Sequence, residues 1–497
     1  MDAYQKIRTA TSGQRLGFLL KDAALYGLTT ALTRLMGLIT LPLLTKSLAP
    51  EQYGLIDSLS VLLAVVVGFC TFGQDSAIAR MFYDTEDHEQ RRRIVSQGLF
   101  IQLAFALPMT LLLLAGHGVV LRVFYGSAPY ARELLLAVLA IPATMVLQSS
   151  RNLLKWTFAR GPFITLSLGL SVCQMTLIVG FVWGGGLEIQ GYFLALLFSN
   201  VLFAILGAYY CRGYWTAAAG LSRMREMLAF GWPYMAAAVV AYLVPAVDRL
   251  CVITALSLEQ AGYYAVGFRV ASLMLLPVMA FQTAWGPFCY ALYKEPDAAE
   301  TYNRILLYFT MVVAFGAFAL ALVAAPVIEL LARPEYLAGA GVVLPLAFGG
   351  ALQGISWITG IGIDLSKKTG YSLASYLIGL LVTLGAMWAL VGHFGILGVS
   401  VGVMLGSLAQ CVSYTLFGYR CYPLRFRLRR PAAALITAGV AGCLSQWLPG
   451  TSGPGKLALQ CIWLLAVAVV FWMVILPGHE RDSLSGRTGA LWRRVRG

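Results

Sequence analysis

The sequence predicts an all-α polytopic membrane protein. Of its 497 residues, 59% are hydrophobic and only 12% are charged, and the mean hydropathy is +0.77. A soluble core of this length needs far less apolar surface. The apolar runs have the length of a membrane-spanning helix, about 20 residues, and short polar turns separate them. A membrane β-barrel would instead show alternating segments of roughly ten residues.

Fourteen apolar runs have spanning length, and they form two sets of six followed by a final pair. They lie at 22–45, 53–74, 94–115, 133–150, 163–183, 191–211, 231–255, 263–290, 304–331, 341–361, 373–392, 398–420, 431–449 and 457–477. We therefore expect two pseudo-symmetric six-helix lobes, at 1–210 and 231–420. An amphipathic cytoplasmic linker at 211–230 joins them, and 421–497 holds helices 13 and 14 with a basic cytoplasmic tail.

An internal repeat supports this division into lobes. The pattern Leu-x-x-Glu-Gln-x-Gly occurs at 48–54 and again at 256–262, which is 208 residues later and at the same place relative to its flanking apolar runs. The segments 160–163 and 368–371 match at the same offset. Both sets of six start from one side of the membrane, so the repeat is parallel. Substrate sites of such repeats form between the two halves.

The basic residues predict the topology. The formal net charge is +14. If both termini lie on one side of the membrane, the tails and loops on that side, with the adjoining run ends Arg304 and Arg420, hold 28 of the 36 Lys and Arg residues. The positive-inside rule then places both termini in the cytoplasm. Topology and attraction to anionic inner-leaflet lipid account for the basic charge, so nucleic acid is not an expected partner.

Three arginines lie inside predicted spanning helices. Arg34 is about midway along the first, and Arg249 and Arg269 lie in the outer halves of the seventh and eighth. An arginine that faces lipid at this depth costs at least about 2.5 to 3.5 kcal/mol. We therefore expect these side chains to face the interior of the bundle, as candidates for a cationic substrate-binding cavity.

Three carboxylates accompany these cations. Asp57 and Asp248 lie at spanning depth, and Asp75 is nearer the cytoplasmic end of the second helix. They are candidates for structural ion pairs or for coupling to protons or sodium ions. Buried charges are normally paired, and Asp248 with the adjacent Arg249 is the pair that best fits this structural interpretation.

The three arginines face only two well-buried carboxylates, Asp57 and Asp248, which leaves a small excess of positive charge. The functional interpretation assigns this excess to an anionic group of the substrate. The planar guanidinium of arginine gives two parallel hydrogen bonds and does not lose its charge, which suits a phosphate or pyrophosphate. The sequence has no Walker A motif, so we do not expect the protein to hydrolyse ATP. We expect no catalytic residue, no metal and no cofactor.

The chain resembles a known family. Residues 40–55 and 72–80 are similar to the N-terminal region of the polysaccharide biosynthesis (oligosaccharide flippase) family, and 247–269, Glu335, Tyr336 and 367–369 are similar to its second half. This family belongs to the multidrug/oligosaccharidyl-lipid/polysaccharide (MOP) exporter superfamily. The resemblance implies a fourteen-helix, V-shaped, two-lobed transporter with a MATE-like fold.

The resemblance also implies a function. Such proteins move undecaprenyl-pyrophosphate-linked oligosaccharides from the inner to the outer leaflet of the bacterial cytoplasmic membrane by alternating access, for O-antigen, capsule or exopolysaccharide synthesis. A polysaccharide polymerase and other assembly proteins are then expected partners. Related flippases have a cationic central cavity, and Arg34 and Arg269 lie on compatible helices.

Three alternatives stay open at this point. One is a flippase for a lipid-linked peptidoglycan precursor. Another is a drug or cation antiporter of the same superfamily, which would want a net acidic interior. The third is a membrane polymerase or glycosyltransferase, which would need a substantial outer loop or a cluster of carboxylates, whereas the longest predicted outer loop runs only from 116 to 132.

Overall fold

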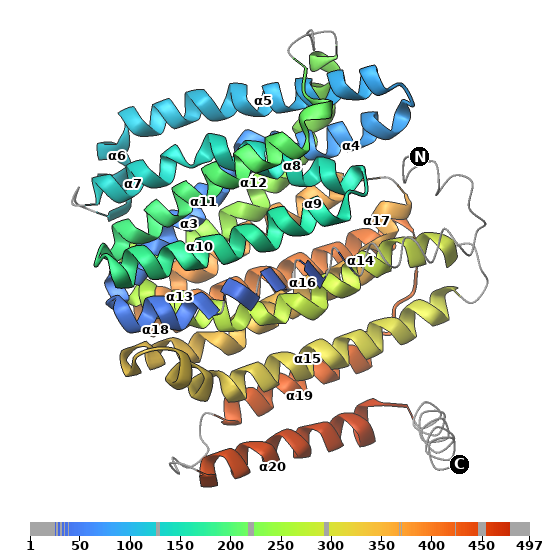
Figure 1. Cartoon of the computed structure of the whole chain (residues 1–497). Helices are drawn as coiled ribbons and strands as arrows, with labels where there is room; N and C mark the ends of the chain where they lie inside the picture. Colours follow the sequence, from blue (N-terminus) through green and yellow to red (C-terminus); the bar gives the residue numbers. More distant parts are fainter. Residues whose placement is uncertain are drawn as a thin grey trace, which may run out of the picture. The chain divides into compact units, whose positions relative to one another are not determined.

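A computed structural model gives the structure of the protein. It describes residues 25, 28–29, 32–33, 35–37, 39–125, 130–216, 223–292, 298–366, 368, 370–422, 424–445 and 454–477. Nearly all of this part is helical and none of it is strand, so the predicted all-α fold is confirmed (Figure 1). Ten of the described helices are long and apolar enough to cross a membrane. The number fourteen stays a prediction.

The helices follow one another with short connections. In chain order they are α3 (Pro50–Thr71), α4 (Gln74–Asp84), α5 (His88–Ala115), α6 (His117–Tyr125), α7 (Ala131–Leu139), α8 (Ile141–Trp156), α9 (Arg160–Ile164), η1 (Thr165–Gly169), α10 (Leu170–Ile178), η2 (Val179–Gly184), α11 (Glu188–Tyr210), η3 (Arg212–Tyr214), α12 (Met224–Ala255), α13 (Leu258–Ala271), η4 (Ser272–Met274), α14 (Leu275–Leu292), α15 (Ala298–Leu331), η5 (Pro334–Val342), α16 (Val343–Thr359), α17 (Ile361–Leu365), α18 (Gly370–Cys421), α19 (Arg429–Ser445), α20 (Pro454–Val470) and η6 (Phe471–Ile475).

The chain divides into two compact units. Unit 1 holds Met1–Val266 together with the short segments Glu329–Leu337 and Met387–Val399, and unit 2 holds Gly267–Ile328, Ala338–Ala386 and Ser400–Gly497. Unit 1 therefore groups these two short segments and 231–266, all from the predicted C-terminal lobe, with the predicted N-terminal lobe. The predicted lobe boundaries stay a prediction.

In unit 1 the helical segment that contains the second predicted spanning run, 53–74, has a break at the end of that run. Phe72 and Gly73 adopt positive φ values of 48° and 64° between α3 and α4. A Cβ on Gly73 would collide with the carbonyl oxygen of Gly231 in α12, so only glycine allows this close approach. Around the break, side chains of α4, α5, α8 and α11 form an apolar core that includes Phe82, Leu147 and Phe203.

The two copies of the repeated motif contact each other in unit 1. A Cβ on Gly54 in α3 would meet the carbonyl oxygen of Leu258, and a Cβ on Gly262 in α13 would meet the carbonyl oxygen of Pro50. Each motif glycine therefore lets the backbone of the other helix approach. We call this end of unit 1, with residues 45–54 and 256–263, the motif end.

We expect Gly262→Ala to lower the stability of the protein by about 1 to 3 kcal/mol, the usual cost of overpacking a tight contact. A thermal unfolding curve in detergent measures this loss. Gly385→Ala in α18 is the matched control, because a Cβ there has no neighbour within 4 Å, and alanine favours a helix. Equal melting temperatures for the two variants would contradict the close contact of the motifs.

Unit 2 is held by packing and by hydrogen bonds from polar side chains to the backbone. Trp285 Nε1 of α14 donates to the carbonyl of Trp357 in α16 at 3.2 Å, and Gln460 Nε2 of α20 donates to the carbonyl of Leu322 in α15 at 2.9 Å. Such bonds satisfy carbonyl groups in a setting where an unsatisfied one costs several kcal/mol.

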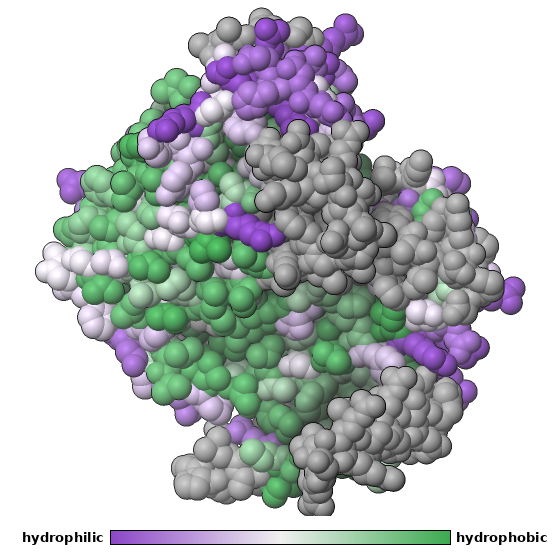
Figure 2. All heavy atoms as spheres, turned by 45° about the vertical axis from the view of Figure 1, so that its right-hand side comes forward, coloured by the Kyte–Doolittle hydropathy of each residue, from purple (hydrophilic) through white to green (hydrophobic). Residues whose placement is uncertain are grey.

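Large hydrophobic side chains cover much of the surface. Leu111 in α5, Leu330 in α15 and Trp388 in α18 are 66%, 73% and 85% exposed. Figure 2 shows many hydrophobic side chains on one face of the molecule. A protein surrounded by water rarely exposes apolar patches of this extent, whereas lipid solvates them. The exposed surface thus agrees with a membrane location.

Candidate functional site

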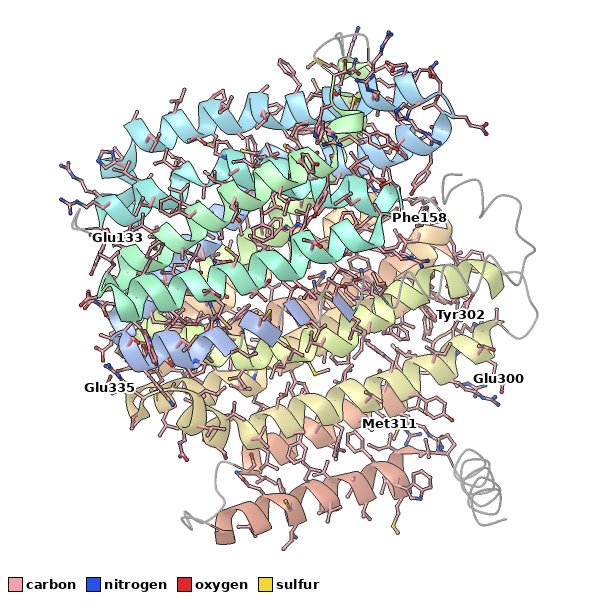
Figure 3. All side chains as sticks on the ribbon, in the orientation of Figure 1. Glu133, Phe158, Glu300, Tyr302, Met311 and Glu335 are labelled. Atoms are coloured by element: carbon pink, nitrogen blue, oxygen red, sulfur yellow. The ribbon has the colours of Figure 1, made fainter. Side chains whose placement is uncertain are left out.

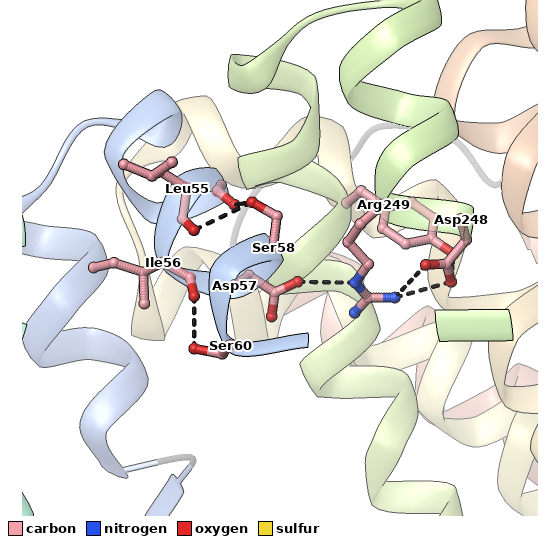
Figure 4. Close-up of polar contacts among 9 residues, drawn as sticks. Leu55, Ile56, Asp57, Ser58, Ser60, Asp248 and Arg249 are labelled. Carbon is pink, nitrogen blue, oxygen red and sulfur yellow. Dashed lines mark hydrogen bonds and ion pairs between the residues drawn. The ribbon is translucent and has the colours of Figure 1, made fainter. Parts of the chain in front are cut away.

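Buried charges meet in unit 1 where three helices pack. We call Asp57 of α3, Asp248 and Arg249 of α12 and Tyr264 of α13 the Asp57 cluster. Their exposures are 9%, 1%, 3% and 0%. Residues 192 positions apart in sequence thus share one buried polar site (Figure 4).

The guanidinium of Arg249 joins both carboxylates. Its Nε donates to Asp57 Oδ2 at 3.0 Å, and its Nη1 donates to both carboxylate oxygens of Asp248 at 2.9 Å. The hydroxyl of Tyr264 donates to Asp248 Oδ2 at 2.9 Å, and its ring centroid lies 5.2 Å from Arg249 Cζ. Asp248 therefore accepts from two side chains.

With both carboxylates ionised, the Asp57 cluster carries two negative charges and one positive charge. Charge-assisted hydrogen bonds of this kind are about twice as strong as neutral ones. Removal of one partner from a buried ion pair leaves an uncompensated charge, which is strongly destabilising. The cluster therefore fixes α3 against α12 and α13 near the motif end.

Asp75 lies in a separate polar site of unit 1, in the first turn of α4. Its two carboxylate oxygens accept hydrogen bonds from Gln102 Nε2 of α5 at 3.3 Å and from Gln148 Nε2 of α8 at 3.0 Å. A carboxylate in the first turn of a helix is also stabilised by the helix dipole. The break at Phe72 and Gly73 creates this helix start, so the break positions the carboxylate.

Two predicted site residues, Arg34 and Arg269, are not part of these two clusters of unit 1 as described. Arg269 is half-buried in the last turn of α13 and belongs to unit 2. Arg34 lies outside the described residues. The substrate-binding roles of Arg34, Arg249 and Arg269 stay predictions, as do the coupling roles of Asp57, Asp75 and Asp248. Among the described residues, no group of three or more His, Cys, Asp or Glu side chains could hold a metal ion.

The motif end carries further polar contacts that join segments distant in sequence. Arg333 Nη2 donates to the carbonyl of Lys46 at 2.7 Å, and Thr45 Oγ1 donates to the carbonyl of Leu331 at 3.0 Å. The hydroxyl of Tyr336 donates to the carbonyl of Leu48 at 3.3 Å. These contacts attach the segment Glu329–Leu337 to the end of the first predicted spanning helix.

Aromatic rings fill the space beside these contacts. The rings of Tyr53 and Tyr263 each meet that of Tyr336 edge to face, with centroids 6.1 Å and 6.0 Å apart. Both motif glutamates accept a tyrosine hydroxyl, Glu51 from Tyr130 and Glu259 from Tyr263. The repeated glutamate thus has the same kind of partner in both copies.

Sequence reasoning did not single out Tyr264. It lies two residues after the second copy of the motif, but no spacing rule relates a phenol on one helix to a carboxylate on its neighbour. A buried aspartate and arginine need further hydrogen-bond partners. A tyrosine on the next helix could therefore have been predicted as one of them.

Comparison with known proteins decides the family. The family model "Polysaccharide biosynthesis protein" matches residues 19–292, more than half of the chain. The chain belongs to the polysaccharide biosynthesis protein family. The predicted resemblance is therefore confirmed. No curated protein sequence matches the chain.

Solved structures of MOP transporters share the fold of this polysaccharide biosynthesis family member. The lipid II flippase MurJ in an inward closed conformation is 13% identical, with a TM-score of 0.70, 90% of this chain covered and 97% of that chain. An inward-facing multidrug resistance MATE transporter of the MOP superfamily is 18% identical, with a TM-score of 0.64 and coverages of 81% and 95%. A mutant of the Vibrio cholerae MATE transporter VcmN is 15% identical, with a TM-score of 0.58 and coverages of 83% and 98%. The protein is thus a multi-pass membrane protein with the predicted MATE-like fold.

Proposed function

We propose that the protein is a flippase for undecaprenyl-pyrophosphate-linked oligosaccharide repeat units. It moves them from the inner to the outer leaflet of the bacterial cytoplasmic membrane by alternating access, for synthesis of a surface polysaccharide. Membership of the polysaccharide biosynthesis family carries this proposal. The fold shared with a lipid II flippase over 90% of the chain supports it. In this proposal the protein acts as a transporter and does not catalyse the formation or cleavage of covalent bonds.

In this proposal the sugar and pyrophosphate pass through the protein interior while the prenyl chain stays in lipid. Polar groups are costly in hydrocarbon, and a prenyl chain is not. Arg34 and Arg269 bind the pyrophosphate, one from each half of the repeat. A negative-inside membrane potential favours outward movement of an anion by about 2.3 kcal/mol per charge per 100 mV, and proton or sodium coupling would add to it.

The Asp57 cluster holds the outer end of the bundle closed in this scheme. With both termini in the cytoplasm, the motif end faces outward. Asp57, the more exposed of the two carboxylates, is then the one more accessible to an ion from outside. Loss of its ion pair with Arg249 would link ion coupling to opening of the outer end.

Reconstitution tests the substrate. Liposomes that contain the protein are supplied with an undecaprenyl-pyrophosphate oligosaccharide on one leaflet, and its appearance on the other leaflet is followed. We expect movement that depends on the protein. Parallel arms use lipid II and a cationic dye, because the likeness to MurJ favours a lipid-linked peptidoglycan precursor as second candidate. Movement of the dye alone would contradict the proposal.

We expect Arg269→Ala to slow transport of the pyrophosphate lipid by about tenfold or more, since a lost charge-assisted bidentate contact costs roughly 1.5 to 3 kcal/mol. Arg269→Lys keeps the charge but not the paired hydrogen bonds and should show an intermediate rate. Arg225→Ala, an exposed arginine of α12, is the control. The same test applies to Arg34→Ala. Parental rates for both arginine variants would overturn the cationic-cavity mechanism.

A further inference from the structure

Unit 2 contains a basic pocket that includes none of the predicted site residues discussed above. Its volume is about 350 Å³. It is lined by the start of α15, by the chain that leads into α19 and by Pro477 after η6. The polar lining residues are Glu300, Asn303, Arg304, Arg427, Arg429 and Arg430. We call it the arginine pocket.

Asn303 builds this pocket by holding the extended chain before α19. Its Nδ2 donates to the carbonyl of Arg425 at 3.0 Å, and its Oδ1 accepts from the backbone N–H of Arg427 at 2.5 Å. The amide thus pairs with the chain on both sides of residue 426, as a neighbouring strand would. This clamp fixes the backbone of Arg427 against α15.

The pocket concentrates positive charge. Four arginines and one glutamate line it, which leaves a formal excess of three positive charges. Glu300 pairs with Arg304 at 3.0 Å, one turn apart on α15 (Figure 3 labels Glu300 at this first turn). Among the described residues, no carboxylate forms an ion pair with Arg427, Arg429 or Arg430.

The start of α19 conflicts with the usual electrostatics of a helix. The first turn of a helix carries unsatisfied N–H groups and partial positive charge, and it favours acidic residues. The first turn of α19 has no acidic residue and begins with Arg429 and Arg430. Local rules are broken chiefly at functional sites. An anion bound beside these arginines would remove the conflict.

Apolar surface continues from the pocket along the helices. Leu307 and Pro431 form buried walls. Further along α19, Ile436 and Val440 are 66% and 53% exposed. An anion with a long apolar tail fits this combination better than a free ion does. The loops that bear the pocket are also on the predicted cytoplasmic side, where anionic lipid headgroups lie.

We infer that the arginine pocket binds the phosphate headgroup of an anionic membrane lipid, with its acyl chains along α15 and α19. Guanidinium groups suit phosphate because they give paired, charge-assisted hydrogen bonds. Arginines that serve only the positive-inside rule need neither a pocket nor side-chain hydrogen bonds that fix their backbone. The Asn303 clamp therefore separates this inference from a general attraction between basic loops and the membrane.

Native mass spectrometry of the full chain in detergent tests the inference. Phosphatidylglycerol, cardiolipin, phosphatidylcholine, undecaprenyl pyrophosphate and inorganic phosphate are titrated separately. We expect anionic lipids to bind with a saturable site that phosphatidylcholine does not occupy. The Arg427→Gln/Arg430→Gln variant should bind them about tenfold to thirtyfold more weakly, at about one kcal/mol per lost contact.

The matched control is Arg223→Gln/Arg225→Gln, which removes the same charge from an exposed part of the predicted cytoplasmic side. It should bind anionic lipid as the parent does. Asn303→Ala keeps every charge but removes the clamp, and it should also weaken binding. Its melting temperature and that of the arginine variant show whether the fold is retained.

Five results would overturn the inference, the first four of which concern the phospholipids and the variants. The first is that the two double variants weaken binding of anionic lipid equally, and the second is that Asn303→Ala binds it as the parent does. The third is that phosphatidylcholine binds as tightly as the anionic lipids. The fourth is that inorganic phosphate competes with the lipid at the same concentration. Binding of undecaprenyl pyrophosphate alone would show that the pocket serves the transport substrate and would overturn the assignment to a membrane phospholipid. Loss of transport in Arg269→Ala with normal lipid binding would separate this pocket from the proposed route.

Discussion

Arg249→Ala is expected to lower the free energy of unfolding by about 3 to 5 kcal/mol. The substitution leaves Asp57 and Asp248 buried close together without their shared cation. Arg249 and Asp248 are 3% and 1% exposed, so water cannot replace the lost hydrogen bonds without an opening of the packing. Denaturation by increasing sodium dodecyl sulfate in mixed micelles, followed by circular dichroism, measures the change.

Two further variants make this test specific. Arg80→Ala removes an exposed ion pair with Asp84 in the same unit and should cost at most about 1 kcal/mol. The triple variant Arg249→Leu/Asp57→Asn/Asp248→Asn removes all three charges together. It should recover much of the loss, since neutral replacement of a buried ion cluster is often tolerated. A loss in Arg249→Ala as small as that in Arg80→Ala would contradict the buried network.

The sequence allowed the charges of this cluster to be found, but not all of its contacts. Asp248 and Arg249 stand out because a charged pair within an apolar run is costly unless it is satisfied. Their third partner, Asp57, is 192 residues away, and only tertiary packing of α3 against α12 brings it near. A lone sequence gives helix lengths and apolar faces, which do not determine which helices touch.

The repeated motif shows the same limit in another form. Its two copies could be recognised by spacing alone, and the offset of 208 residues predicted two related halves. That Gly54 and Gly262 lie against each other's helices could not be predicted, because a glycine is equally compatible with a turn, a bend or a close contact. The helix breaks were closer to the prediction: Gly395, with a positive φ value, lies in the turn predicted between the runs 373–392 and 398–420, and Gly73 lies at the end of the run 53–74.

The arginine pocket was hidden for a different reason. Arg425, Arg427, Arg429 and Arg430 were visible as a basic loop, and the positive-inside rule accounts for such a loop fully. The added information is the side-chain amide of Asn303, more than 120 residues earlier, which shapes that loop into a pocket. A polar residue in the first turns of a long apolar helix carries no pattern that distinguishes a clamp from a solvated side chain.

The second large effect concerns the contact of Arg333 with Lys46 at the motif end. The guanidinium of Arg333 donates two hydrogen bonds to the carbonyl of Lys46, at 3.1 Å and 2.7 Å. In the proposed alternating access the outer end of the bundle opens, so under that proposal these segments separate once per cycle. Lys46→Cys/Arg333→Cys, in a variant without the nine native cysteines, allows a reducible bifunctional thiol reagent to join them.

We expect the cross-link to reduce lipid-linked oligosaccharide transport in liposomes to the level without protein, and a reductant to restore it. Arg92→Cys/Trp215→Cys is the matched control. Arg92 Nη2 likewise donates to a carbonyl, that of Trp215 at 3.2 Å, but both residues belong to the predicted N-terminal half and its linker. The control cross-link should leave the rate unchanged because those segments move together. Full transport by the cross-linked Lys46→Cys/Arg333→Cys protein would mean that the motif end stays closed throughout the cycle, and the substrate would then need a route that does not pass between these segments.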